Sequence, residues 1–141
     1  TGIHIGPGCT NITISNCSSS VTLPNAYVMC ATLQSGPTAA QQFGATCIQI
    51  HDVHEFAVRV ARALKPSGGI KCAVLGAVRY RPREYRQLEA EPGPIGFVKP
   101  HRYSREAEFR FMWFPYERTI RPEIIELGSL RDIASLCAQN V

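Results

Sequence analysis

The chain of 141 residues is 45% hydrophobic and 18% charged, and it carries a formal net charge of +4. This composition is typical of a globular domain with a substantial core, and the mild basic bias fits anionic ligands such as dinucleotides or RNA without requiring them. No apolar run approaches the roughly 20 residues that a membrane-spanning helix needs, so we expect no membrane segment.

The chain is expected to form a single domain over residues 1–141. Its first residues, TGIHIGPGCTN, lack the basic and apolar regions of a signal peptide. A start at Thr1 suggests a fragment cut from a longer protein.

The six cysteines predict thiols rather than disulfides or metal ligands. None belongs to a C-x-x-C pair, and Cys30, Cys47 and Cys72 lie within apolar runs, as buried thiols do. His51 and His54 have no cysteine at a spacing suited to zinc, so we expect no metal site. The pattern favours a reducing compartment, the cytoplasm.

The first half of the chain predicts strands followed by one helix. Residues 1–25 combine β-branched and turn residues, which favours two short strands. The apolar runs AYVMCATL (26–33) and ATCIQIHD (45–52) predict two further strands with buried residues. Apolar residues then recur one helical turn apart between residues 53 and 64, and Asp52 is placed to cap the helix.

The second half predicts three strands and a terminal helix. The strands are expected in IKCAVLGAVRYR (70–81), FRFMWFPY (109–116) and PEIIELGSL (122–130). The last segment, SLRDIASLCAQNV (129–141), predicts a short helix with Ser129 as its cap. Together these elements predict an α+β protein with mixed, mostly antiparallel sheets, one central helix and a short C-terminal helix.

Two glutamates open the strand in YSREAEFRFMWF (103–114). Because residues two apart on an extended segment point to the same side, Glu106 and Glu108 are expected to share a face and one carboxyl pKa to rise. Such a pair suits chemistry in which one carboxylate stabilises a cation and the other accepts a proton. The spacing also occurs by chance on polar strand faces, where Arg105 or Arg110 would neutralise the charges, although Arg110 is expected on the opposite face.

The order of these elements resembles the ADP-ribosyltransferase fold of bacterial toxins. YVMCATLQS (27–35) stands where that family has a strand ending in a Ser-Thr-Ser-like motif, with Thr32 as the best hydroxyl. FGATCIQI (43–50) corresponds to the loop with glycine and phenylalanine and the strand after it. SREAEFRFMWF (104–114) corresponds to the strand that opens with E-x-E, and His4 is the N-terminal candidate for the family's cofactor-binding residue.

One segment carries a second resemblance. FVKPHRYSREAEFRF (97–111) is similar to the K…Y-x-x-E-x-E-x-R signature of an uncharacterised group of bacterial phage-resistance (abortive-infection) proteins. The resemblances together span residues 26–114, and the E-x-E segment is their sharpest part.

The transferase resemblance implies cleavage of the bond between nicotinamide and ribose in NAD and transfer of ADP-ribose. Glu108 would stabilise the ribose cation, and Glu106 would orient or deprotonate the acceptor. Thr32 would hydrogen-bond Glu108 and hold its rotamer, Tyr103 would stack on the nicotinamide, and His4 would contact the adenosine ribose or the phosphates.

The resemblance also implies a biological setting. The chain would be a glycosyltransferase-class catalytic domain of a bacterial toxin or effector that acts in the cytosol of a target cell. Its acceptor would be a protein or an RNA, and a cognate immunity protein would block its cleft.

Two other classes of function stay open. The first is an RNA-binding or RNA-cleaving toxin domain, favoured by the basic stretch VRYRPREYR (78–86) and by three candidate acid–base groups, His51, His54 and His101. The second is a catalytically inactive interaction module with the transferase fold.

Overall fold

The computed structural model describes residues 22–35, 44, 46–64, 68–82, 94–117 and 119–138. His4 and most of the segment predicted to form two N-terminal strands lie outside these residues. Within the described part of the chain, no helix is both long and apolar enough to cross a membrane.

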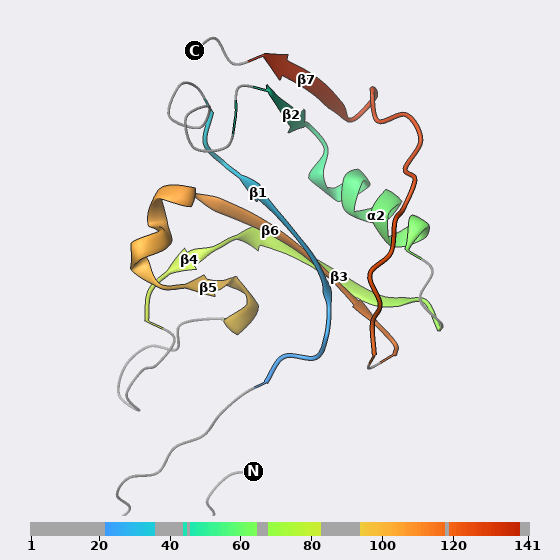
Figure 1. Cartoon of the computed structure of the whole chain (residues 1–141), viewed down its shortest axis with the longest axis horizontal. Coiled ribbons are helices and arrows are strands. Elements are labelled where there is room, and N and C mark those ends of the chain that lie inside the picture. Colours follow the sequence, from blue (N-terminus) through green and yellow to red (C-terminus); the bar gives the residue numbers. More distant parts are fainter. Residues whose placement is uncertain are drawn as a thin grey trace, which may run out of the picture.

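The main sheet has three strands in the order β1-β6-β3, with β6 in the centre. Strands β1 (Tyr27–Thr32) and β3 (Ile70–Ala77) both run antiparallel to β6 (Glu108–Pro115), as Figure 1 shows. Because a central strand is covered on both edges, β6 contains most of the buried strand residues. The strands expected near 26–33, 70–81 and 109–116 are therefore confirmed, as is the α+β class with mostly antiparallel sheets.

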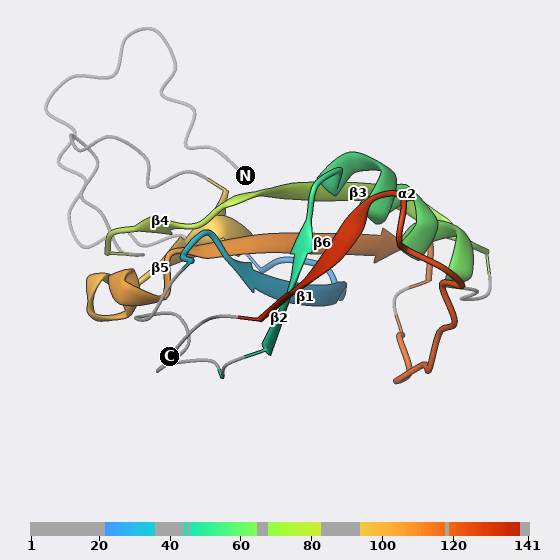
Figure 2. The ribbon, with the colours of Figure 1, turned by 90° about the horizontal axis from the view of Figure 1, so that it is seen from above.

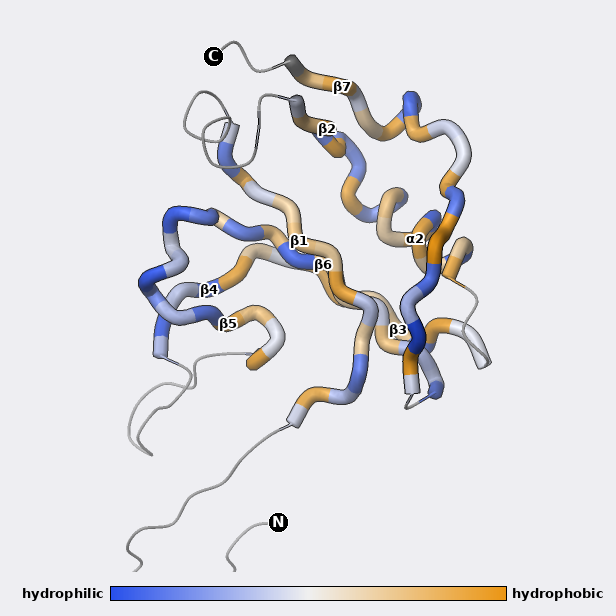
Figure 3. Tube along the Cα trace, in the orientation of Figure 1, coloured by the Kyte–Doolittle hydropathy of each residue, from blue (hydrophilic) through white to orange (hydrophobic). Residues whose placement is uncertain are grey.

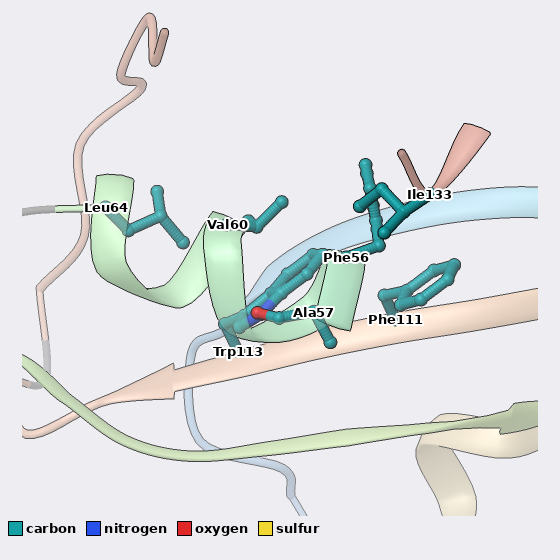
Figure 4. Close-up of a cluster of buried hydrophobic side chains, with 7 residues drawn as sticks. All are labelled: Phe56, Ala57, Val60, Leu64, Phe111, Trp113 and Ile133. Carbon is teal, nitrogen blue, oxygen red and sulfur yellow. The ribbon is translucent and has the colours of Figure 1, made fainter. Parts of the chain in front are cut away.

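Helix α2 (Val53–Ala63) covers one face of the main sheet. The predicted cap is confirmed, because the Asp52 Oδ1 atom accepts hydrogen bonds from the backbone N–H groups of His54 at 3.1 Å and Glu55 at 2.9 Å. The helical stripe packs against aromatic residues of β6 and against the C-terminal segment, as Figure 4 shows for Phe56, Ala57, Val60, Leu64, Phe111, Trp113 and Ile133. This cluster is the main hydrophobic core.

Two smaller sheets flank the main one. Strand β2 (Thr46–Ile50) pairs antiparallel with β7 (Ala134–Ala138), on the same side of the molecule as α2 (Figures 1 and 2). Strand β4 (Arg79–Tyr80) pairs parallel with β5 (Val98–Lys99). The 3₁₀ helix η1 (Ile95–Phe97) lies directly before β5.

The predicted C-terminal helix is wrong. Residues 131–133 form a turn, and the chain then enters β7, whose backbone groups pair with those of β2. Ser129 does act locally, because its Oγ accepts from the backbone N–H of Arg131 at 3.5 Å, but this bond supports a turn rather than a helix. Pairing with a strand far away in sequence overrides a weak local helical pattern.

The strand predicted at 122–130 is also wrong. This segment is extended and alternates, with Ile125 and Leu127 packed against the core and Ile124 and Glu126 exposed. Its backbone pairs with no described strand. The alternation of exposed and packed residues therefore belongs to a segment that covers α2 and not to a strand of a sheet.

The cysteines predicted to be buried are not. Cys30 and Cys72 are exposed and Cys47 is half-buried. An antiparallel sheet that packs on one face buries alternate residues only, so Cys30 faces away from its core-facing neighbours Met29 and Ala31. A continuous apolar run therefore misled the expectation.

Candidate active site at the start of β6

The chain makes a tight turn where it enters β6. The 3₁₀ helix η2 (His101–Glu106) ends at Ala107, which has φ 40° and ψ 49°, in the left-handed region that residues with a Cβ rarely adopt. The two glutamates are thus separated by a turn and do not lie on one extended strand, which corrects the geometry expected from the sequence. Figure 3 shows the hydrophilic residues of η2 meeting the more hydrophobic β6 at this point.

The two carboxylates nevertheless meet, at the ammonium group of Lys99. The Nζ atom forms an ion pair with Glu106 Oε2 and lies 3.0 Å from Glu108 Oε2. The hydrogen bond to Glu106 raises the pKa of Lys99 above its usual value against the opposing effect of burial, and Glu108 adds to the rise. The ammonium group therefore stays charged and offsets the repulsion between the two acids.

Glu108 is the most enclosed charge of the site, with 4% of its surface exposed. The Arg110 Nε atom lies 2.7 Å from its Oε1, and Arg110 also donates to the carbonyl of Gly96. Burial raises the pKa of Glu108, but hydrogen bonds from Arg110, Cys30 and Lys99 outweigh it and lower the pKa to about 2. Glu108 is therefore an anion at neutral pH, and the pKa rise expected from its pairing with Glu106 is wrong for this residue.

Arg110 lies on the same side of β6 as Glu108, which corrects the expectation that it faces away. Residues that are two positions apart on a strand point to the same face. Gly96, whose carbonyl accepts from Arg110, packs closely against β6, because a Cβ there would lie 2.8 Å from the Met112 Sδ atom. Burial lowers the pKa of Arg110, but its bond to Glu108 raises the pKa above the ordinary value overall.

The backbone of Glu108 is held from both neighbouring strands. Its N–H donates to the Tyr80 hydroxyl at 2.7 Å, and its carbonyl accepts from the Val78 N–H at 2.9 Å. On the other side it pairs in register with Thr32 of β1. The position of this carboxylate is therefore fixed by both its main chain and its side chain.

The resemblance implies that Thr32 holds the Glu108 carboxylate. In the structure Thr32 instead holds the turn between Glu106 and Glu108. Its hydroxyl donates to the Glu106 carbonyl at 2.8 Å and accepts from the Gln34 N–H at 3.1 Å. The Leu33 N–H donates to the Ala107 carbonyl at 2.8 Å, which ties the same turn to β1. Thr32 thus acts on the acids through the backbone between them.

Tyr103 belongs to the same cluster. Its ring centroid lies 4.9 Å from Lys99 Nζ and 4.9 Å from Arg102 Cζ, so cations already contact the ring. Glu106, by contrast, keeps 29% of its side-chain surface exposed. Glu106 is accordingly the more accessible of the two acids.

The sequence prediction located the cluster and named Arg110 as a residue that could neutralise the acids, which the ion pair with Glu108 bears out. It gave no role in the cluster to Lys99 or Tyr80. The K…Y-x-x-E-x-E-x-R signature already contained Lys99 and Arg110. The signature residues form one contact network in space, and they are Lys99, Tyr103, Glu106, Glu108 and Arg110.

Other candidate features lie elsewhere. A cavity of about 670 Å³ lies between α2 and the covering segment, lined by Arg59, Arg62, Ala63 and residues 123–127. Within the described part of the chain, no three His, Cys, Asp or Glu side chains group as a metal site.

The residues favoured for RNA chemistry are dispersed. The His51 Nε2 atom bonds to Ser135 Oγ at 2.8 Å beside β7, His54 is exposed on α2, and His101 begins η2. The predicted basic stretch, residues 78–86, is described only up to residue 82, and residues 83–86 lie outside the described part. The described histidines form no hydrogen-bonded acid–base pair.

No family model, curated protein or solved structure matches the chain. The case for a function therefore rests on the contacts at the start of β6.

Proposed function

We propose that the chain is the catalytic domain of an NAD-dependent mono-ADP-ribosyltransferase of the bacterial toxin or effector class. The observation that carries the proposal is that Tyr103, Glu106 and Glu108 all contact the Lys99 ammonium group, while Thr32 holds the Glu106 carbonyl beside them. The transferase resemblance implies a role for each of these four residues, which come from β1, η2 and β6.

Glu108 supplies the fixed negative charge of the proposed reaction. When the bond between nicotinamide and ribose breaks, its electron pair leaves with nicotinamide and the ribose becomes cationic. A carboxylate with a pKa of about 2 is ionised throughout the neutral range, so it can stabilise that cation without a proton transfer. Its bonds to Arg110 and Lys99 preset the carboxylate orientation.

Glu106 serves the acceptor. Its side chain is 29% exposed, so an incoming protein or RNA nucleophile can approach it. The nucleophile forms the new bond to the ribose carbon and passes its proton to Glu106. Lys99, between the two acids, balances their charge.

The test is release of nicotinamide from NAD by the purified chain. We expect Glu108→Gln to lower turnover at least a hundredfold, equivalent to about 2.7 kcal/mol of barrier, while the circular dichroism spectrum stays native. Glu126→Gln, at an exposed position on the covering segment, is the matched control and should leave turnover unchanged. Turnover of Glu108→Gln close to that of the unaltered chain would remove Glu108 from the mechanism.

The variant Glu106→Gln distinguishes the role of Glu106 from that of Glu108. Loss of Glu106 should reduce transfer to the acceptor more than hydrolysis of NAD, because water needs less orientation than a bulky nucleophile. Labelled ADP-ribose on the acceptor, measured beside nicotinamide release, reports the two rates. Equal losses in both would contradict the role given to Glu106.

One observation favours a second candidate, a non-catalytic interaction module. Glu108 is 4% exposed and already bound by Lys99 and Arg110, as a structural charge would be. This candidate predicts no nicotinamide release, and equal binding of a partner such as an immunity protein by the unaltered chain and by Glu108→Gln in a pull-down.

A further inference from the structure

Two cysteines face each other across the β2–β7 pair. In the antiparallel register Cys47 is directly opposite Cys137. Directly opposed residues of an antiparallel pair have Cα atoms about 4.5 or 5.5 Å apart and side chains on the same face. Both spacings fall within the roughly 4.4–6.8 Å that a disulfide bridges.

The opposed thiols are accessible to small reagents. Both residues are half-buried, and the Cys137 thiol donates a hydrogen bond to Gln49 Oε1 at 3.4 Å. Gln49 is exposed and stands two residues from Cys47, so it shares the face on which the thiols meet. The contact with a polar, exposed amide places this face toward water.

The other described cysteines lack such a partner. Cys30 is opposite Arg110 on β6, and Cys72 is opposite Phe114. Arg110 and Phe114 are four residues apart on β6, which corresponds to about 13 Å along the strand. Cys30 and Cys72 are therefore too far apart for a disulfide. Burial and hydrogen bonding to Glu108 also raise the pKa of the Cys30 thiol, which disfavours its reactive thiolate.

We propose that Cys47 and Cys137 form a dithiol–disulfide site that exchanges with small-molecule disulfides of the glutathione class. One thiol loses its proton, and its sulfur attacks the small disulfide, which releases one small thiol and leaves a mixed disulfide. The second protein thiolate then attacks the protein sulfur of that bond and releases the second small thiol. The two protein thiols are oxidised by two electrons, and the small disulfide is reduced to two thiols.

The link would strengthen a junction that already exists. The backbone N–H of His51, directly after β2, donates to the Ile133 carbonyl, directly before β7, at 2.8 Å. A bond between Cys47 and Cys137 would close a loop that contains α2 and the strands β3, β4, β5 and β6. Constraining so long a loop in the unfolded chain stabilises the folded state. This site is independent of the proposed transferase activity.

The first test maps the disulfide in the unaltered full chain. The protein is equilibrated with reduced and oxidised glutathione at several ratios, unreacted thiols are blocked with N-ethylmaleimide, and the chain is digested without reductant. Mass spectrometry should find the peptides of Cys47 and Cys137 linked, in a fraction that rises with the oxidised share. Alkylation of both cysteines at every ratio, or a dominant link from either to Cys9 or Cys17, would overturn the proposal.

The second test uses matched variants and does not depend on activity. The oxidised chain should unfold roughly 5 to 15 °C above the reduced chain. Cys47→Ser and Cys137→Ser should each abolish that difference, whereas Cys30→Ser and Cys72→Ser should keep it. A shift that survives in Cys47→Ser would assign the stabilisation to another pair and refute the site.

Discussion

The two faces of strand β6 are built on different physical principles. Phe109, Phe111 and Trp113 face α2 and join the apolar core, whereas Glu108 and Arg110 face the opposite way and form ion pairs. The apolar face is held by burial and ring packing, with the Phe111 and Trp113 centroids 5.8 Å apart. The charged face is held by mutual neutralisation. We therefore expect the free energy of unfolding to depend on side-chain volume at the apolar face. At the charged face we expect it to depend on pH and on the presence of each ion-pair partner.

The largest expected effect is on the apolar face. Phe111 is 1% exposed, so Phe111→Ala should lower the free energy of unfolding by about 4 kcal/mol. Urea titrations at pH 7 and at pH 3 should give the same loss, because the core cluster around Phe111 consists of apolar side chains. Phe111→Leu is the milder control, at about 1.5 kcal/mol. A loss that varies strongly with pH would break the distinction between the faces.

The next effect removes a partner on the charged face. Arg110→Met keeps much of the side-chain volume but leaves Glu108 with Lys99 as its remaining cation, and we expect a loss of about 3 kcal/mol at pH 7. Arg62→Met, at an exposed position on α2, is the control and should change stability by less than about 0.5 kcal/mol. Equal small losses in both variants would show that the buried pair contributes little.

Acid should affect the charged face with a defined sign. The pKa of Glu108 falls from 4.5 to about 2 on folding, which corresponds to about 3 kcal/mol. Because the folded-state pKa is the lower one, this stabilisation is fully present above about pH 4.5 and is lost as the pH falls toward 2. Stability measured across this window should fall more steeply for the unaltered chain than for Glu108→Gln. Parallel curves would assign the acid sensitivity to other carboxylates.

The smallest effect concerns the turn between the two acids. Thr32→Val removes the hydroxyl that donates to the Glu106 carbonyl and should cost about 1 kcal/mol. Thr32→Ser retains the hydroxyl and should recover most of the loss. Chemical denaturation resolves a difference of this size. An unchanged free energy of unfolding in Thr32→Val would show that this hydrogen bond does not stabilise the turn.

The elements that could be predicted from sequence are those with a local cause. The Asp52 cap, the apolar stripe of α2 and the run Phe109–Phe114 each carry their signal within a few residues. The C-terminal helix was predicted wrongly because β7 depends on β2, which lies far away along the chain. No local pattern contains that partner.

The candidate site was predictable as a set of residues but not as a geometry. The spacing identified Glu106 and Glu108 as candidates. The turn between them depends on the left-handed conformation of Ala107, which could not be predicted because alanine rarely adopts it. The role of Lys99 depends on the parallel β4–β5 pair, which places its side chain beside both acids. The low pKa of Glu108 follows from that placement and from Arg110, and neither could be obtained from spacing alone.

The central position of β6 also constrains how the protein is made. Strands β1 and β3 meet only through β6, and β2 pairs with β7, so within the described chain the earlier strands are synthesised before their partners. Until then Val28, Ile48 and Val74 sit on unpaired edges. Exposed strand edges favour aggregation during synthesis, and a chaperone that shields nascent strands would bind β1, β2 and β3.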